Sequence, residues 1–202
     1  MEKLSLAFYQ RKDVIEIAKD LLGKIVVTNI YGKITSGRIV ETEAYVANVD
    51  KASHAYNGKR TLRNEAMYAA AGAVYVYICY GMHNMLNIVT NDLNVPDAIL
   101  IRALEPTKGI EIMLERTGKK MFDNTLTKGP GNVAKAMGIS KSISGLMLGE
   151  KIINIYKDDL SFLQDEIGTS KRIGIDGAGT DAELPYRFFV KGNKFVSGRP
   201  VR

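Results

Sequence analysis

The strongest constraint on the fold is an apolar run at positions 74–89 that turns back on itself. Residues 74–79 are rich in β-branched and aromatic side chains, and the apolar pattern resumes at residues 85–89. Such composition is typical of β-strands. Between the two runs lies Tyr80-Gly81-Met82, and glycine readily adopts the positive φ that a tight hairpin turn needs. The stretch therefore predicts a two-stranded hairpin.

The tip of this hairpin carries Tyr80 and Met82, where exposed turns usually carry small polar residues. One interpretation is ordinary packing of both side chains onto a neighbouring loop. The other is a wedge, because an aromatic side chain on a rigid finger can enter a stacked target, as minor-groove proteins do when they part base steps. The choice depends on the rest of the chain.

A second informative stretch is RIVETEAY at positions 38–45. Side chains two apart on a strand share a face, so Glu41, Glu43 and Tyr45 should point together. They form either a polar strand edge or part of a functional surface. Arg102 interrupts the apolar segment 98–104, and a buried guanidinium without a partner is costly. We therefore expect Glu41 or Glu43 beside Arg102, as a core ion pair or as a catalytic one.

Two further segments suit contacts with an anion. The long polar loop 46–64 holds His54 and ends in a cluster of basic residues, namely Lys59, Arg60 and Arg63. These are either a solvated face or phosphate contacts. Residues 129–132 open a predicted helix that ends at Gly138. Free N–H groups near Gly131 suit an anion, although a plain helix start explains them equally well.

The remaining pattern predicts one α+β domain over residues 1–202. Asp13 is placed to cap a helix over residues 14–22, and further helices are expected at 65–71 and 108–116. Besides the hairpin, strands are expected at 24–30, 34–45, 98–104, 152–156, 172–175, 187–190 and 194–197.

Composition narrows the function classes. The chain has 28 Lys and Arg against 22 Asp and Glu, a net charge of +6, which favours a polyanionic partner without identifying one. The single cysteine, Cys79, excludes an internal disulfide and suits a reducing compartment. No apolar run resembles a signal peptide or a membrane span. We expect a cytoplasmic protein that is not secreted, lying in the nucleoid if the source is bacterial.

Metal and cofactor motifs are missing from the sequence. His54 and His83 are the only histidines, and no HExxH or CxxC spacing occurs, so we expect no zinc site. No glycine-rich phosphate cradle of the GxxxxGK[ST] or GxGxxG type is present either. We therefore expect neither a metal nor a cofactor.

Several motifs together resemble one family, the alkyladenine DNA glycosylases, also called AAG-type 3-methyladenine DNA glycosylases. In chain order they are RIVETEAY, the loop ASHAYNGKRTLRN, the hairpin AGAVYVYICYGMHNMLNIV, ILIRALEP, LTKGPGNVAKAMGI and LPYRFFVKGNKFVS. The similarity covers nearly the whole chain. It implies a curved, mostly antiparallel sheet with flanking helices and a protruding β-hairpin.

The resemblance also implies a function and a set of roles. It implies a base-excision repair enzyme that flips alkylated or deaminated purines out of duplex DNA and hydrolyses the N-glycosidic bond. No lysine matches a nucleophile, so we expect a monofunctional hydrolase. The implied partner is double-stranded DNA containing a damaged purine, with no membrane, and the protein is expected to act as a monomer.

The implied roles fall into four groups. Glu43 would activate the attacking water, held by Arg102 and the backbone carbonyl of Ile173. The base pocket would be formed by Tyr45, His54, Tyr77, Asn87 and Ile173, with Asn87 crowding the amino group of guanine. The intercalating residues would be Tyr80 and Met82, and the DNA backbone would be held by Lys59, Arg60, Arg63 and Gly131. His83 and Asn132 depart from some relatives, which carry tyrosine and lysine there.

Two other functions fit parts of the sequence. An inverting glycoside hydrolase could use Glu41 and Glu43, since two strand residues span about 7 Å. The basic charge and the absence of tryptophan weigh against it. A non-catalytic minor-groove DNA-binding module would use the Tyr80 finger without the pocket chemistry.

Overall fold

The structure is a computed structural model that describes residues 1–198, so the last four positions of the predicted domain lie outside the described residues. Nine strands form one sheet within this part of the chain. The strands are β1 (Glu2–Lys3), β2 (Ile25–Ile30), β3 (Lys33–Tyr45), β4 (Val74–Cys79), β5 (His83–Thr90), β6 (Asp97–Lys108), β7 (Ile153–Lys157), β8 (Ile167–Ser170) and β9 (Arg187–Val190). The α-helices are α1 (Leu6–Tyr9), α2 (Val14–Asp20), α3 (Ile110–Thr117) and α4 (Pro130–Met137). The 3₁₀-helices are η1 (Glu65–Tyr68), η2 (Asn124–Leu126), η3 (Lys141–Ile143), η4 (Gln164–Glu166) and η5 (Asp176–Glu183).

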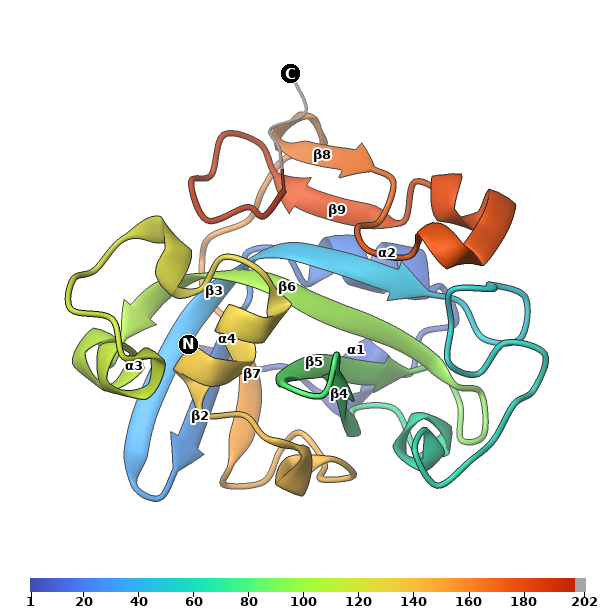
Figure 1. The fold of residues 1–202 in the computed structure, drawn as a ribbon, viewed down its shortest axis with the longest axis horizontal. Helices are drawn as coiled ribbons and strands as arrows, with labels where there is room; N and C mark the ends of the chain where they lie inside the picture. Colours follow the sequence, from blue (N-terminus) through green and yellow to red (C-terminus); the bar gives the residue numbers. More distant parts are fainter. Residues whose placement is uncertain (199–202) are drawn as a thin grey trace.

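Strand β3 organises the sheet. The strands follow the order β1-β7-β2-β3-β6-β5-β4, and neighbours pair antiparallel. The first half of β3 pairs with β2, whereas residues Glu41, Thr42 and Glu43 pair with β9. β9 in turn pairs with β8, and both lie across the top of the view in Figure 1. The α+β fold with an antiparallel sheet is therefore confirmed.

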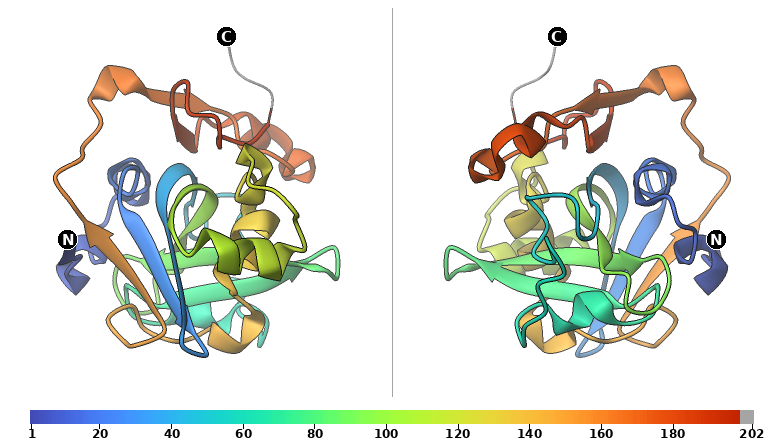
Figure 2. Two further views of the ribbon diagram at one scale, coloured as in Figure 1. Left: turned by 90° about the vertical axis from the view of Figure 1, so that its left-hand side faces the viewer. Right: turned by 90° about the vertical axis from the view of Figure 1, so that its right-hand side faces the viewer.

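Helices cover both faces of the curved sheet (Figure 2). Helix α2 contacts β3, β6 and β9, and α4 contacts β5 and β6. Asp13 begins α2 as expected, because its carboxylate accepts hydrogen bonds from the backbone N–H groups of Ile15 and Glu16 at 3.0 and 3.1 Å. A smaller apolar cluster lies at the β4–β5 side of the sheet, formed by Ala55, Met67, Tyr68, Ala73, Tyr75, Val89 and Ala98. It supports the cavity described below.

The β4–β5 hairpin has the predicted turn, with one unexpected feature. Gly81 has φ 72°, and Tyr80 also lies in the left-handed region at φ 50°, which bulky residues rarely adopt. The two side chains at the tip point into solvent: Tyr80 is 84% exposed and Met82 71% exposed. Packing of the tip onto a neighbouring loop, the first interpretation above, is therefore wrong.

Three predicted elements are also wrong. Residues 172–175 form no strand; the strand lies just before them, in β8. Residues 194–197 are a turn and coil segment rather than a strand, and their backbone serves the site instead, since the N–H of Ser197 donates to Glu41. The predicted helix over 65–71 is only the short 3₁₀-helix η1. Within residues 1–198, no helix is long and apolar enough to cross a membrane.

Candidate active site

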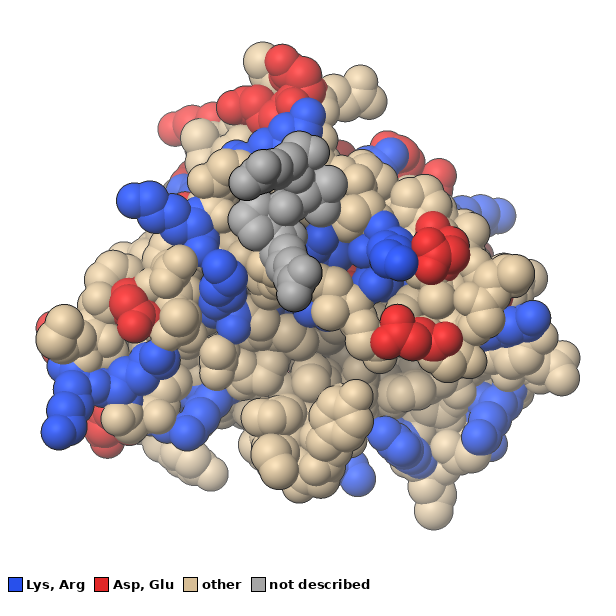
Figure 3. All heavy atoms as spheres, turned by 45° about the horizontal axis from the view of Figure 1, so that its top comes forward, with Lys and Arg blue, Asp and Glu red and all other residues tan. Residues whose placement is uncertain are grey.

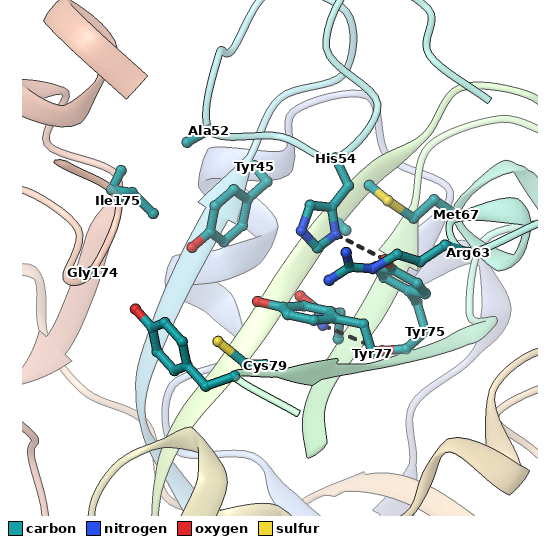
Figure 4. Close-up of a pocket in the computed structure, with 13 residues that line it drawn as sticks. Tyr45, Ala52, His54, Arg63, Met67, Tyr75, Tyr77, Cys79, Gly174 and Ile175 are labelled. Atoms are coloured by element: carbon teal, nitrogen blue, oxygen red, sulfur yellow. Dashed lines mark hydrogen bonds between the residues drawn. The ribbon is translucent and has the colours of Figure 1, made fainter. Parts of the chain in front are cut away.

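A cavity of about 240 Å³ opens between the end of β3, the loop that follows it and strand β4. Tyr45 and Tyr77 lie on different sides of it, and His54 lies between them (Figure 4). The lining residues are Tyr45, Ala52, His54, Arg63, Met67, Tyr75, Tyr77, Cys79, Tyr80, Asn87, Ala98, Gly174 and Ile175. Four of the five residues expected in the base pocket therefore meet here, namely Tyr45, His54, Tyr77 and Asn87; the fifth, Ile173, lines a neighbouring cavity instead.

The two tyrosine side chains stay protonated across the physiological range. Burial raises the pKa of Tyr77 to about 12. Burial, together with the charge of Glu43, raises the pKa of Tyr45 well above its usual value. Both rings therefore offer neutral aromatic faces to whatever enters the cavity. The edge of the His54 ring meets Tyr77, with ring centres 4.5 Å apart and planes at 76°.

Asn87 is held rigidly at the wall of this cavity. Its amide nitrogen donates to the backbone carbonyls of Tyr75 and Met85, at 3.3 and 3.1 Å. The side chain is almost fully buried. Because two backbone groups hold the amide, Asn87 cannot swing away from a bulky ligand without losing hydrogen bonds.

Glu43 lies one side-chain layer behind the cavity wall and is 0% exposed. Its Oε2 accepts from the Tyr45 hydroxyl at 2.8 Å, and its Oε1 accepts from the backbone N–H of Ile173 at 2.8 Å. Arg102 Nη1 lies 3.2 Å from the same Oε1. These three residues all line a second cavity of about 180 Å³, which shares Tyr45, Tyr77, Cys79, Tyr80, Gly174 and Ile175 with the first. A small molecule there would meet the groups that hold the Glu43 carboxylate.

Both carboxylate oxygens of Glu41 accept hydrogen bonds from other groups of the protein. Its Oε1 accepts from Arg187 Nε at 2.6 Å, from Arg102 Nε at 3.2 Å and from the Ser197 hydroxyl at 2.9 Å. Its Oε2 accepts from the Ser197 N–H at 2.7 Å. Neither Glu41 nor Glu43 lines the two cavities, but the groups that hold Glu43, namely Tyr45, Ile173 and Arg102, line the second one. The expected basic partner of Glu41 is confirmed, and there are two such partners.

Arg102 joins both carboxylates. Burial alone would lower its pKa, but the charges of Glu43 and Glu41 outweigh burial and raise it. The guanidinium therefore stays charged and compensates both buried carboxylates. The expectation that Glu41 or Glu43 would lie beside Arg102 is confirmed for both.

The expected DNA-backbone residues are not equivalent. Arg60 forms an ion pair with Glu65 and lies over the Tyr68 ring. Arg63 lines the main cavity and lies near the Tyr77 ring, 5.9 Å from its centre. Lys59 is exposed. In one view of the surface, Lys and Arg side chains lie on both sides of a central uncharged area, with some Asp and Glu side chains among them (Figure 3).

Gly131 lies in the first turn of α4, against the hairpin. A Cβ at Gly131 would lie about 3.0 Å from the ring of His83, so a larger residue here would have to displace the exposed His83 side chain slightly. His83, the first residue of β5, therefore lies beside the N-terminal turn of α4, while Tyr80 and Met82 stay exposed.

Sequence reasoning missed one group of supporting residues. Arg172 is buried, pairs with Asp50 through both terminal nitrogens of its guanidinium, Nη1 and Nη2, and donates to the backbone carbonyl of Ala44 at 2.9 Å. Its guanidinium lies 4.8 Å from the centre of the Tyr45 ring. Asp50 and Arg172 are 122 positions apart, so no local pattern joins them.

Tyr75 was also missed, although a signal was present. It lies two positions before Tyr77 on β4, and alternation alone places both on one face. Its hydroxyl lies 2.8 Å from His54 Nδ1. Among residues 1–198, no group of three or more His, Cys, Asp or Glu side chains is placed to hold a metal ion.

The sequence is similar to one protein family over nearly its whole length. A family model described as methylpurine-DNA glycosylase matches residues 7–194. A protein of Clostridium perfringens strain 13 is 43% identical over 203 residues, covering 96% of this chain and 98% of its own length. A protein of Desulfitobacterium hafniense is 42% identical over 204 residues, covering 98% and 99%. One of Chlamydia pneumoniae is 44% identical over 184 residues, covering 91% and 92%. All three carry the provisional name 3-methyladenine DNA glycosylase.

Proposed function

The chain belongs to the methylpurine-DNA glycosylase family, and from this premise we propose that its cavity receives one damaged purine turned out of duplex DNA. As a family member it is a base-excision repair glycosylase, a hydrolase of N-glycosidic bonds. The observation that carries the proposal is the buried Glu43 carboxylate, held by Tyr45, Ile173 and Arg102 directly behind the wall of an aromatic cavity.

The cavity suits a single planar base. Its volume of about 240 Å³ is below the roughly 300–1,000 Å³ of pockets that take drug-sized ligands. Alkylated purines are often cationic, and the faces of Tyr45 and Tyr77 would each contribute roughly 0.5–2 kcal/mol of cation–π attraction. Asn87, held by two backbone carbonyls, would crowd the exocyclic amino group of a guanine.

Glu43 is the group that would activate water. Once a base occupies the first cavity, its sugar would face the second one, where Arg102 and Ile173 form part of the wall. The Glu43 carboxylate, which Tyr45, Arg102 and Ile173 hold behind that wall, would accept a proton from water and stabilise the positive charge that develops on the sugar. Arg102 and the backbone carbonyl of Ile173 would orient the water. Glu41, saturated by Arg187, Arg102 and Ser197, is a structural group in this account.

The hairpin would hold the DNA open. Tyr80 and Met82, exposed at the tip, would fill the gap left by the flipped nucleotide, which offsets the few kcal/mol of lost stacking. Lys59, Arg63 and the N-terminus of α4 near Gly131 would contact phosphates, with a smaller part for Arg60 because Glu65 already pairs with it. We expect the protein to act on double-stranded DNA as a monomer.

A panel of duplexes tests the proposal, each carrying one lesion: 3-methyladenine, 7-methylguanine, hypoxanthine or ethenoadenine. The expected result is release of the free base from at least one of them, leaving an intact strand that breaks only on alkali treatment. EDTA should leave the rate unchanged, and borohydride should trap no covalent complex. Release of no base, strand cleavage without alkali or a trapped adduct would each contradict the proposal.

A further inference from the structure

Tyr75 lies behind His54 in the small apolar cluster beside the cavity. Tyr75 is 1% exposed, and its hydroxyl lies 2.8 Å from His54 Nδ1. No other hydrogen-bond partner of this hydroxyl occurs among residues 1–198. One proton therefore lies between the Tyr75 hydroxyl and His54 Nδ1. Which of the two groups donates it determines whether Nε2 of His54 is a donor or an acceptor toward the cavity.

The environment of the hydroxyl settles which group donates. Burial raises the pKa of Tyr75 far above its usual value, so the hydroxyl keeps its proton. A buried donor without an acceptor is costly, and His54 Nδ1 is the one acceptor in reach within the described residues. If Nδ1 carried the proton instead, the phenol proton would have no partner. The Tyr75 hydroxyl therefore donates to Nδ1.

We propose that Tyr75 fixes His54 in the tautomer whose proton sits on Nε2, so that the ring presents one N–H donor to the everted base. Tyr75 is a positioning residue, since it acts through His54 and has no donor of its own left for the base. The part of the inference that concerns the base rests on the proposed function. The part that concerns the tautomer does not.

The orientation of the ring supports this role. In Figure 4 the hydrogen bond to Tyr75 leaves from one ring nitrogen, and the other nitrogen points into the space between His54 and Tyr45. The edge-to-face contact with Tyr77, whose ring centre lies 4.5 Å from that of His54, also restrains the His54 ring. Rotation of the ring would break both contacts, so the direction of the Nε2–H bond is set before any ligand arrives.

The charges around the ring keep it neutral. Burial, then the nearby charges of Arg63 and Lys59, lowers the pKa of His54. The tyrosines on the adjoining strand, Tyr75 and Tyr77, are protonated and uncharged. A neutral ring has one donor and one acceptor, and Tyr75 already occupies the acceptor.

This arrangement has a consequence for specificity. An N–H donor favours a base that offers a lone pair at the facing position, such as a ring nitrogen or a 6-oxo group. An amino group there would place two donors face to face and leave both unpaired. The opposite tautomer of His54 would reverse the preference.

The first test reads the tautomer in the free protein. Nitrogen-15 NMR distinguishes Nδ1–H from Nε2–H, and the chain has only two histidines, so a His83→Gln variant assigns the signals. We expect the Nε2–H form in the wild type, and a mixture or the Nδ1–H form in Tyr75→Phe. Tyr68→Phe removes another hydroxyl of the same cluster, one that donates to the Lys59 carbonyl, and should leave the His54 signals unchanged. An Nδ1–H form in the wild type would overturn the proposal.

The second test locates the base atom. Duplexes containing hypoxanthine are compared with three analogues that each lack one acceptor: N3, N7 or O6. Binding is measured in Glu43→Gln, to avoid excision, with and without Tyr75→Phe. One analogue should lose roughly fivefold in affinity, the size of one neutral hydrogen bond, and that loss should shrink in the Tyr75→Phe background. Additive losses for all three analogues would overturn the role in base recognition. Failure to bind any duplex would instead count against the proposed function and leave the tautomer result standing.

Discussion

At the scale of single residues, Glu41 and Glu43 differ through their surroundings. They lie two positions apart on β3, and alternation correctly indicated that Glu41, Glu43 and Tyr45 belong together. Alternation could not indicate which carboxylate is held by residues that line a cavity, as Glu43 is. Arg187 and Ser197 saturate Glu41 from 146 and 156 positions away, and no local pattern encodes contacts of that separation.

The tip residue Tyr80 supplies the first prediction. Tyr80→Ala should lower excision from paired duplex more than from single-stranded DNA, because the wedge is lost while the cavity is unchanged. Single-turnover excision rates on the two substrates measure this. Since position 80 has φ 50°, Tyr80→Asn serves as a control that suits the turn better. Equal losses on both substrates would contradict the wedge.

The second prediction concerns the side-chain amide of Asn87. Asn87→Ala should raise excision of guanine-type bases relative to hypoxanthine, because truncation removes the group that crowds an exocyclic amine. The measurement is the ratio of the two excision rates, with thermal unfolding followed in parallel because two backbone carbonyls lose a donor. An unchanged ratio would assign the discrimination to another residue of the cavity.

At the scale of elements, the long apolar segments were predicted correctly as strands, whereas short segments without regular structure were predicted wrongly. β4 and its turn lie where the apolar run and Gly81 placed them. Residues 172–175 and 194–197 were expected as strands because they are short and apolar, yet their backbone groups bind carboxylates rather than strands: the N–H of Ile173 binds Glu43 and that of Ser197 binds Glu41. Short apolar runs do not reveal such long-range partners.

The start of α2 allows a stability prediction. Asp13→Ala should lower the free energy of unfolding by about 1 kcal/mol, because the helix loses a cap that accepts from Ile15 and Glu16. Urea unfolding measures it. Asp13→Asn keeps the acceptor and should stay close to the wild type, and an Ala variant as stable as the wild type would contradict the capping role.

At the scale of the whole molecule, the net charge of +6 predicts salt-dependent binding. If about four phosphates are neutralised, affinity for duplex DNA should fall by about a hundredfold between about 50 and 200 mM salt. Lys59→Ala should reduce the salt slope by about one unit. Arg60→Ala should reduce it less, because Glu65 already pairs with Arg60. An affinity for duplex DNA that does not change with salt concentration would contradict an interface built on phosphate contacts.

The central claim is that Glu43, and not Glu41, activates the water. The most direct measurement is the single-turnover excision rate and the lesion affinity of Glu43→Gln, with Glu41→Gln as the matched control on the same strand. Glu43→Gln should lose at least roughly 100-fold in excision while binding persists, because the base and counter-charge are gone but the shape remains. Glu41→Gln should chiefly lower thermal stability, because Arg187 loses its buried carboxylate partner and Arg102 loses one of its two. A folded Glu41→Gln protein without excision, together with a Glu43→Gln protein that excises normally, would contradict the account.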